Sequence, residues 1–295
     1  MNKKVALLSM DSLENFYTYD KMLIQPMNKL GWTTEEISWR DKTVDWNNYD
    51  AVIVRSTWDY QNDPENFFQI LEKINSVSHL ENDLDLMRWN MNKKYLFDLE
   101  KKGIKIVDTI WENKLNGDSI LKYFKIFNSD EIIIKPNISA NADNTFRLSK
   151  KNVDEHLDHI KKIFSSREFM VQPFQQNIVA EGEYSLFFFN GEHSHAVIKK
   201  PKERDFRVQE EHGGIIRGII PTEELISIGG NIINKLFVVP LYARIDLVRD
   251  NHGDFSLIEL ELIEPSLYFN RDKTAAQKFS IAFSKKWEQA NSARN

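Results

Sequence analysis

The sequence ARIDLV at positions 243–248, followed after a polar turn by LIELELIEP at positions 257–265, decides the fold of this chain. Apolar and charged residues alternate in both segments, and this pattern predicts two strands of a hairpin, because successive side chains of a strand point to opposite faces. Arg244 and Asp246 then share one face with Glu259 and Glu261. The apolar residues of the hairpin are expected on the other face: Ile245, Leu247, Ile258, Leu260 and Leu262.

The three carboxylates of this hairpin predict a site for a divalent cation. Like charges opposed across a sheet are destabilising, so a positive charge should lie among Asp246, Glu259 and Glu261. Arg244 supplies one positive charge. Three oxygen ligands, with no cysteine and no histidine nearby, in addition match a hard ion such as Mg²⁺. The alternative is a solvent-facing amphipathic hairpin, although such strands usually mix charge signs or carry Thr, Lys and Ser.

Composition limits the class of protein. The 295 residues can bury a substantial core in two domains or one multilobed unit. A net charge of -5 and a pI of about 5.9 argue against nucleic acid or an anionic membrane as the main partner. The chain has no cysteine, which excludes a disulfide framework and a thiolate nucleophile and fits the cytoplasm. The first apolar run ends at Asp11, too short for a secretory signal, and no stretch is long enough to span a bilayer.

The N-terminal part alternates strand and helix, which indicates an α/β opening. Strands are predicted at 5–9 and 49–55, with a helix over 20–30 between them that Gly31 stops. The apolar run at 51–54 is typical of a strand buried on both faces of a parallel sheet.

This second strand delivers the sequence RSTWDY, residues 55–60, to the carboxyl edge of the sheet, where ligands of open α/β sheets bind. Two interpretations stay open for its aromatic residues. Trp58 and Tyr60 contact a substrate, or they only seat the loop against the next helix, which Asp63 and Pro64 begin as N-cap and first residue.

A change in composition near 84–89 indicates a domain boundary. A helix over 90–102, a strand over 104–110 and a helix ending near 127 are predicted after it. The apolar strand 131–136 carries Lys135 near its end, which is costly unless the ammonium meets an anion or emerges into a cleft. The polar segment 137–145 that follows could curl its backbone amides around phosphate oxygens, or be a surface loop without function.

The next predicted elements are a strand over 168–174 and a hairpin over 181–200 turned by Asn190-Gly191. Residues 204–214 then mix cations with a pair of glycines. His193 and His195 share a strand face and could ligate a metal, but two histidines without a third ligand are more often structural.

The ordered set of segments resembles the ATP-grasp enzymes, with the spacing closest to the glutathione synthetase and ribosomal-protein glutamate ligase branch. The segments are NKKYL at 92–96, IIKP at 133–136, MVQPF at 170–174, GEYS at 182–185, and the two strands of the hairpin. Within that branch, residues 55–60 and 258–265 are similar to the O-ureido-serine cyclo-ligase family of cycloserine biosynthesis. The resemblance covers nearly the whole chain, and it lies in the combination, since a Walker A sequence and a GxGxxG sequence are absent.

The resemblance implies an ATP-grasp fold of the α/β class with a parallel-sheet N-terminal domain. It implies a substrate domain over 1–86, a lid subdomain over 87–171 and a metal-binding subdomain over 172–295. The implied activity is an ATP-dependent and Mg²⁺-dependent carboxylate-amine ligase, which forms an acyl phosphate of a small amino-acid-like substrate and releases ADP and phosphate. Two Mg²⁺ ions are expected, with Mn²⁺ as a substitute, and the protein is expected to be a homodimer or homotetramer.

The resemblance also assigns roles to residues. The implied contacts of ATP are Lys94, Lys135, Ser139, Gln172, Pro173 and Phe174, with Glu181 or Glu183 at the ribose. The implied metal ligands are Asp246, Glu259 and Glu261, and Arg244 would act with Lys135 on the transferring phosphoryl group. The candidates for contact with the acid or the acceptor are Arg55, Ser56, Trp58, Lys199, Arg207 and Gly213.

Two departures from the family pattern stand out. Glu261 replaces the usual metal-binding Asn, and residues 139–145 replace a glycine-rich lid loop. Two other functions remain as alternatives: a nucleotide-binding regulatory module without catalysis, and an ATP-independent metal hydrolase that uses the hairpin and the histidines. Retention of both lysines and all three acids favours the ligase.

Overall fold

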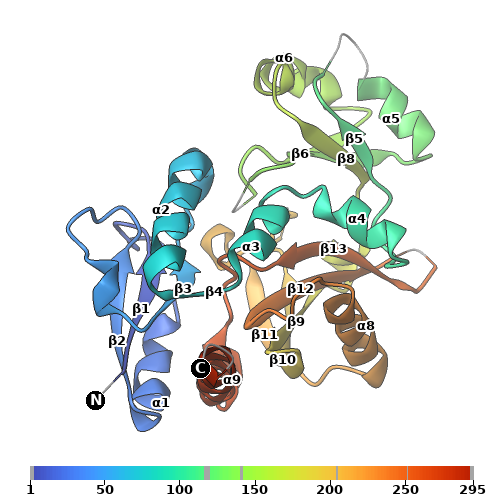
Figure 1. The fold of residues 1–295 in the computed structure, drawn as a ribbon. Coiled ribbons are helices and arrows are strands. Elements are labelled where there is room, and N and C mark those ends of the chain that lie inside the picture. Colours follow the sequence, from blue (N-terminus) through green and yellow to red (C-terminus); the bar gives the residue numbers. More distant parts are fainter. Residues whose placement is uncertain (1–2, 116–119, 140–141, 204, 251, 293–295) are drawn as a thin grey trace.

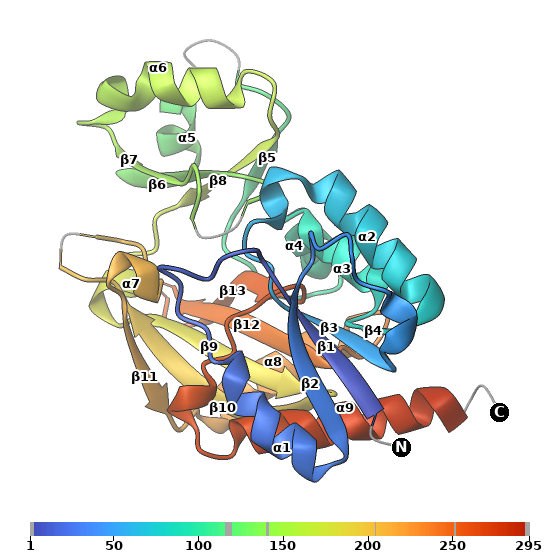
Figure 2. The ribbon, with the colours of Figure 1, turned by 90° about the vertical axis from the view of Figure 1, so that its left-hand side faces the viewer.

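The structure, a computed structural model, describes residues 3–115, 120–139, 142–203, 205–250 and 252–292. Within these ranges the strands form three sheets (Figure 1). A lobe with one of the four-stranded sheets stands above the five-stranded sheet, and the N-terminal sheet lies beside them (Figure 2). The mixed helix and sheet architecture with a parallel N-terminal sheet confirms the predicted fold class.

The N-terminal sheet is parallel, with the order β2 (Trp32–Ser38), β1 (Lys3–Ser9), β3 (Ala51–Ser56) and β4 (His79–Glu81). Both apolar runs predicted as strands are buried, and all six residues of β3 are inaccessible. Helix α2 (Pro64–Val77) begins at the predicted proline, although the Asp63 side chain does not cap it. The predicted helix over 20–30 is a 3₁₀ turn (Asp20–Leu23) followed by α1 (Ile24–Lys29), and Gly31 ends it with a φ of 80°.

The middle lobe holds the antiparallel sheet β5 (Ile110–Glu112), β8 (Phe169–Pro173), β6 (Glu131–Pro136) and β7 (Phe146–Ser149). Helices α5 (Ile120–Ile126) and α6 (Val153–Phe164) pack on this sheet and bury an apolar cluster with it (Figure 2).

Two predictions in this region are wrong in detail. The predicted helix over 90–102 is divided into α3 (Leu84–Met91) and α4 (Tyr95–Lys101), because Asn92 is extended and its side chain accepts from the Lys94 amide at 3.0 Å. Of the predicted strand over 104–110, Ile110 begins β5, and residues 104–109 are irregular apart from one bridge between Ile106 and Leu257. Ile104 and Ile106 pack in the core beside the five-stranded sheet.

The five-stranded sheet is antiparallel and follows the order β11 (Ile215–Ile219), β10 (Glu192–Lys200), β9 (Glu183–Phe189), β12 (Tyr242–Arg249) and β13 (Phe255–Glu261). The predicted hairpin of β9 and β10 turns at Asn190 and Gly191, whose φ angles are both positive. The short α7 (Asn177–Ala180) precedes β9, and α8 (Glu223–Asn234) and α9 (Ala275–Ser292) pack on the sheet. Val5, Phe187 and Phe279 belong to one buried cluster, so the N-terminal sheet, the five-stranded sheet and α9 share a core.

One residue of the decisive hairpin lies on the face opposite to the predicted one. Asp246 pairs with Glu259 and Leu247 pairs with Leu257, so Ile258 is the extra residue of a β-bulge. Because a bulge shifts the alternation by one residue, Leu257 takes the core position, and Ile258 lines the same cavity as Glu259.

Candidate active site

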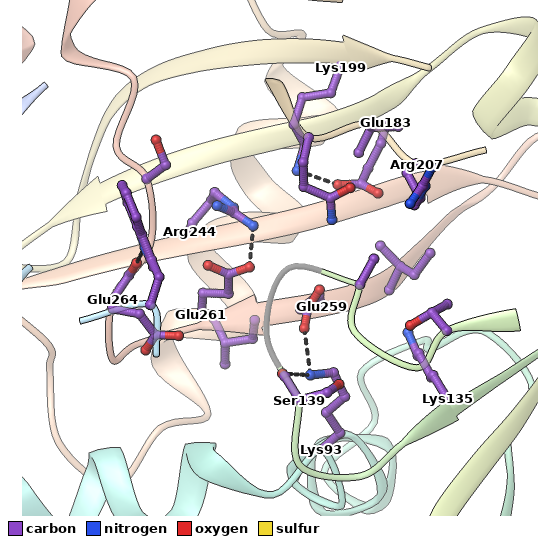
Figure 3. A pocket seen from close by; sticks show the side chains of 18 of the residues that line it. Lys93, Lys135, Ser139, Glu183, Lys199, Arg207, Arg244, Glu259, Glu261 and Glu264 are labelled. Carbon is purple, nitrogen blue, oxygen red and sulfur yellow. Dashed lines mark hydrogen bonds and ion pairs between the residues drawn. The ribbon is translucent and has the colours of Figure 1, made fainter. Parts of the chain in front are cut away.

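A cavity lies where the three sheets meet. Five elements contribute side chains to its walls. These are Trp58 from the loop after β3, Lys135 from β6, Gln172 from β8, Lys199 from β10 and Glu259 from β13. The carboxyl edge of the N-terminal sheet, the middle lobe and the five-stranded sheet therefore each contribute polar side chains to one space (Figure 3).

The three carboxylates of the hairpin converge, as predicted. Asp246, Glu259 and Glu261 each offer an oxygen, and these oxygens lie within 4.8 Å of one another. The strand register explains this arrangement, because Asp246 is opposite Glu259 and Arg244 is opposite Glu261 across the β12–β13 pair. Three carboxylate oxygens within this span fit a hard divalent cation.

Cations surround the three carboxylates. The Arg244 guanidinium donates to Asp246 at 3.0 Å and contacts Glu261. The Lys199 ammonium lies 3.2 Å from Asp246 and also contacts Glu183. All five groups are largely or partly buried, which strengthens their interactions relative to a surface pair.

Electrostatics set different protonation preferences among the acids. Burial opposes ionisation of Asp246, but Arg244 and Lys199 outweigh it and lower the pKa of Asp246 to about 2. The pKa of Glu261 is raised to about 7, mainly by burial. The negative charges of Glu259 and Asp246 raise this pKa further, and the positive charge of Arg244 lowers it only in part. Strongly shifted carboxyls in a cavity are typical of functional sites.

Of two adjacent lysines, only the first faces the cavity. The Lys93 ammonium lies 3.0 Å from a Glu259 oxygen and donates to the Ser139 carbonyl at 2.9 Å. Lys94, the residue named from the sequence, lies at the N-cap of α4 and points away, to Glu168 at 2.9 Å. Sequence reasoning missed Lys93 because the direction of two consecutive lysines depends on where the helix begins.

The other proposed nucleotide contacts from the middle lobe lie together. Lys135 is buried at the end of β6, and burial lowers its pKa. Gln172 and Phe174 line the same cavity; the Gln172 amide donates to Thr109 at 2.9 Å, and the Arg147 guanidinium lies 3.7 Å from the centre of the Phe174 ring. Pro173 ends β8 between them and is not among the lining residues.

The loop named from the sequence is described in part. Ser139 and Thr145 line the cavity, whereas Ala140 and Asn141 lie outside the described residues. Arg204 of the later polar segment and Asn251 of the hairpin turn also lie outside them.

The two candidates for the ribose separate in space. Glu183 lines the cavity and contacts Lys199. Glu181 lies outside the set of lining residues, where Arg249 at 3.2 Å and the Tyr184 hydroxyl hold it.

Some candidates for substrate contact line the cavity and others do not. Trp58, Lys199 and Arg207 line the cavity, and Arg207 is paired with Asp205 at 2.9 Å. Gly213 does not line it and forms a left-handed turn with a φ of 82°.

Arg55 and Ser56 are buried behind the cavity wall. Arg55 is 2% exposed and donates to Asp20 and to the Pro265 carbonyl, both at 3.0 Å. The Ser56 hydroxyl donates to the same Asp20 at 2.5 Å. Both residues therefore hold neighbouring chain segments together, and neither lines the cavity.

His195 has a structural role. His195 stacks on Phe187 at 4.3 Å, and its Nε2 lies 2.9 Å from the Leu267 carbonyl; burial lowers its pKa to about 4. Among the described residues, the group of potential metal ligands that converges contains Asp246, Glu259 and Glu261 and no histidine. The arrangement proposed for a metal hydrolase with histidine ligands is therefore not formed in the described part of the chain.

Tyr60, one of the two aromatic residues left open by the sequence, also lines the cavity. Sequence reasoning missed four other wall residues, Asn90, Tyr95, Glu264 and Tyr268. The sequence did contain a signal for Glu264, because it is a third acid, three residues after Glu261, in the segment 257–265. The two-residue alternation of a strand ends before Glu264 and so did not predict which way its side chain points.

Comparisons with known proteins agree with the resemblance predicted from the sequence. Residues 5–82 match the family model described as the N-terminal domain of D-cycloserine synthetase DcsG. The cycloserine biosynthesis protein DcsG of Streptomyces lavendulae is 25% identical over 281 residues, which cover 90% of this chain and 92% of the relative.

Solved structures share the fold. The crystal structure of D-cycloserine synthetase DcsG superposes with a TM-score of 0.85 at 24% identity, covering 96% of this chain and 99% of the other. D-alanine–D-alanine ligase from Bacillus anthracis in complex with ATP gives a TM-score of 0.69 at 13% identity, covering 99% and 100%. The ATP-grasp ligase PsnB, solved with Mg and ADP, gives 0.67 at 13% identity, covering 97% and 99%.

Within the described residues, no helix combines the length and the apolar character needed to cross a bilayer. These comparisons support the predicted resemblance: the chain is similar over nearly its whole length to the cycloserine biosynthesis protein DcsG and has the fold of the ATP-grasp ligases.

Proposed function

We propose that this protein joins the carboxylate of a small amino-acid-like substrate to an amine, with ATP as the source of energy and an acyl phosphate as the intermediate. One observation carries the proposal: Glu259 and Glu261, whose oxygens converge with one of the buried Asp246, line a single cavity with Lys93, Lys135 and Arg244. An all-oxygen metal site beside several cations is what a transferring phosphoryl group needs, because charge builds on its oxygens.

In this proposal the cavity divides into a nucleotide end and a substrate end. Lys93 and Lys135 bind phosphate oxygens, and the backbone of 172–174 lies along the adenine, with Glu183 nearest to the ribose. Asp246, Glu259 and Glu261 hold Mg²⁺, which when bound would neutralise charge on the phosphates. Arg244 lies beside the γ-phosphate.

The proposed reaction needs no protein nucleophile. A carboxylate oxygen of the substrate attacks the γ-phosphorus and ADP leaves; the amine then attacks the acyl carbon and phosphate leaves. Lys199 and Arg207 are proposed to orient the reacting acid or the acceptor. A closed cavity protects the acyl phosphate from hydrolysis.

The relatives name two ways to complete such a reaction. D-cycloserine synthetase makes a ring, whereas D-alanine–D-alanine ligase joins two molecules. Mass spectrometry of the product distinguishes ring closure from ligation, because a ring forms from one acid molecule with loss of water.

Calorimetry with ATP and Mg²⁺, followed by assays of ADP release with candidate acids, tests the proposal. A variant with both Glu259→Gln and Glu261→Gln serves as the comparison. We expect Mg²⁺-dependent binding of ATP by the wild type, loss of that dependence in the variant, and ADP release only with certain acids. Binding of nucleotide without any acid-stimulated turnover would instead support a regulatory module, and acid-independent hydrolysis without ATP would support a metal hydrolase.

A further inference from the structure

The segment that follows β13, residues 262–265, is fixed in place by side chains from elsewhere in the chain. Asn82, Trp58 and Arg55 donate to the backbone carbonyls of residues 262, 264 and 265 over 2.8, 2.8 and 3.0 Å. The Tyr242 hydroxyl lies 2.7 Å from the Val54 carbonyl and 2.9 Å from the carbonyl of residue 263. We call residues 262–265 the strap. Since buried donors hold three of its four carbonyls, the backbone of the strap is rigid.

The strap carries Glu264, a cavity-lining carboxylate without a partner. Glu264 is only 9% exposed, yet within the described ranges no hydrogen bond or ion pair holds its side chain. The other acids around the cavity differ in this respect, because Glu183 contacts Lys199, Glu259 contacts Lys93 and Glu261 contacts Arg244. A buried carboxylate without a counter-charge is costly, and a rigid strap cannot move it out to solvent.

The position of Glu264 relative to the phosphate-binding groups is informative. Figure 3 shows Glu264 at one side of the cavity and Lys135 at the other, with Glu261 and Glu259 between them. Glu264 therefore lies at the end of the cavity away from Lys135, in the same cavity as Arg244, beside which the acid is proposed to react.

The surroundings of Glu264 suit a small cation. Trp58 and Tyr60 line the cavity, where Trp58 donates to the Glu264 carbonyl, and burial together with the charge of Glu264 raises the pKa of the Tyr60 hydroxyl. Aromatic faces attract ammonium groups. Burial raises the pKa of Glu264, and the charge of Glu261 raises it further. Lys93 and Arg244 lower this pKa in part, but neither forms an ion pair with Glu264, and a bound ammonium would supply that direct contact.

We propose that Glu264 binds the ammonium group of the acid substrate and so makes the enzyme select amino acids over acids without an amine. This inference rests on the proposed function, and it names the group that determines specificity. The reacting carboxylate and the ammonium would then be held at two fixed points, by Arg244 and by the strap.

The test compares matched pairs of acids in an assay that needs no natural acceptor. Alanine and serine, as both enantiomers, are compared with propionate and 3-hydroxypropionate in the presence of ATP, Mg²⁺ and hydroxylamine. Hydroxylamine attacks the acyl phosphate, giving a hydroxamate and phosphate, so hydroxamate and ADP report activation of the acid.

In the wild type we expect at least one amino acid to be activated much better than its counterpart without the amine. Glu264→Gln, which keeps the shape and removes the charge, should lower kcat/KM for that amino acid about 10- to 100-fold, mainly through KM. The rate with the counterpart should stay unchanged, and Glu264→Asp should retain part of the preference. Glu72→Gln, whose carboxylate contacts Arg88 on the surface of α2, is the control and should change neither rate.

Several results would overturn the inference. These are equal activation of paired acids by the wild type, an unchanged preference in Glu264→Gln, or activation of none of the acids although Mg²⁺ and ATP still bind. If the wild type does not bind ATP at all, the proposed function fails as well, so the two failures are distinguishable. A thermal melt shows whether Glu264→Gln is folded, and Glu264→Asp supplies a second measurement if it is not.

Discussion

Replacement of two adjacent lysines offers the sharpest test of the site. The Lys93 ammonium is buried between Glu259 and the Ser139 carbonyl, whereas the Lys94 side chain is 42% exposed and pairs with Glu168, itself 43% exposed. We expect Lys93→Met to weaken ATP binding and Lys94→Met to leave it unchanged. Met is unbranched and only one atom shorter than Lys, and it removes the charge together with the hydrogen-bond donors.

The magnitudes follow from these surroundings. A charged hydrogen bond to a buried phosphate contributes about 1.5–3 kcal/mol, so Lys93→Met should raise the Kd of ATP with Mg²⁺ roughly 10- to 150-fold. Loss of the solvent-screened Lys94 pair should lower the free energy of unfolding by about 0.2–1 kcal/mol at most. The opposite pattern, with ATP binding sensitive to Lys94 and indifferent to Lys93, would refute the assignment of the cavity.

Calorimetry measures both dissociation constants directly, and urea unfolding measures both stabilities. Lys93 also neutralises Glu259, so the titration is repeated over a range of Mg²⁺ concentrations. A deficit of Lys93→Met that disappears at high Mg²⁺ would place the effect on the metal ligand and not on the phosphate.

Further predictions concern packing, pH and the metal. Gly229→Ala should destabilise the protein by about 1–3 kcal/mol, because a Cβ there would lie 2.6 Å from the buried Phe188 ring. At the adjacent Gly230 a Cβ would have no atom within 4 Å, so Gly230→Ala should stabilise α8 by up to about 1 kcal/mol. Urea unfolding of both variants checks this, and equal effects would contradict it. The folded-state pKa of His195 is about 4, below its unfolded value near 6.5, so the unfolded state binds the proton more tightly. Stability should therefore fall by roughly 2 kcal/mol from pH 6.5 to 5, and His195→Gln should lose that part of the pH dependence. Removal of Mg²⁺ with EDTA should weaken ATP binding in the wild type but hardly affect the Glu259→Gln, Glu261→Gln variant; equal sensitivity would argue against a metal at these acids.

Local patterns predicted the hairpin and the buried strands. The alternation of charge in β12 and β13 depends on the two-residue period of a strand, and the register then brings Asp246, Glu259 and Glu261 together. The apolar run before Lys135 likewise predicted a strand that ends at a cavity.

Features that depend on one residue of register were not predictable. The bulge at Ile258 moved a single side chain to the other face, and the break at Asn92 decided which lysine faces the cavity. Both depend on the backbone conformation of a single residue. The period of apolar residues is judged over several residues, so it does not predict such a local change. Arg55 was a reasonable candidate for a ligand contact by position and charge, but its partners, Asp20 and Pro265, lie 35 and 210 residues away.

The ion pairs of the cavity explain how so many charges can be held together before any ligand binds. Lys93 with Glu259, and Arg244 with Asp246 and Glu261, neutralise one another at short range. A metal ion alone would compete with the lysine and the arginine for the acids, and a triphosphate alone would compete with the acids for the cations. In the proposed complex with both, each cation would exchange a carboxylate for a phosphate and each acid would exchange a cation for the metal. Glu264 stands outside this exchange, because within the described residues no ion pair holds it that the metal or the phosphate could replace, and in our proposal the ammonium group of the substrate completes the site.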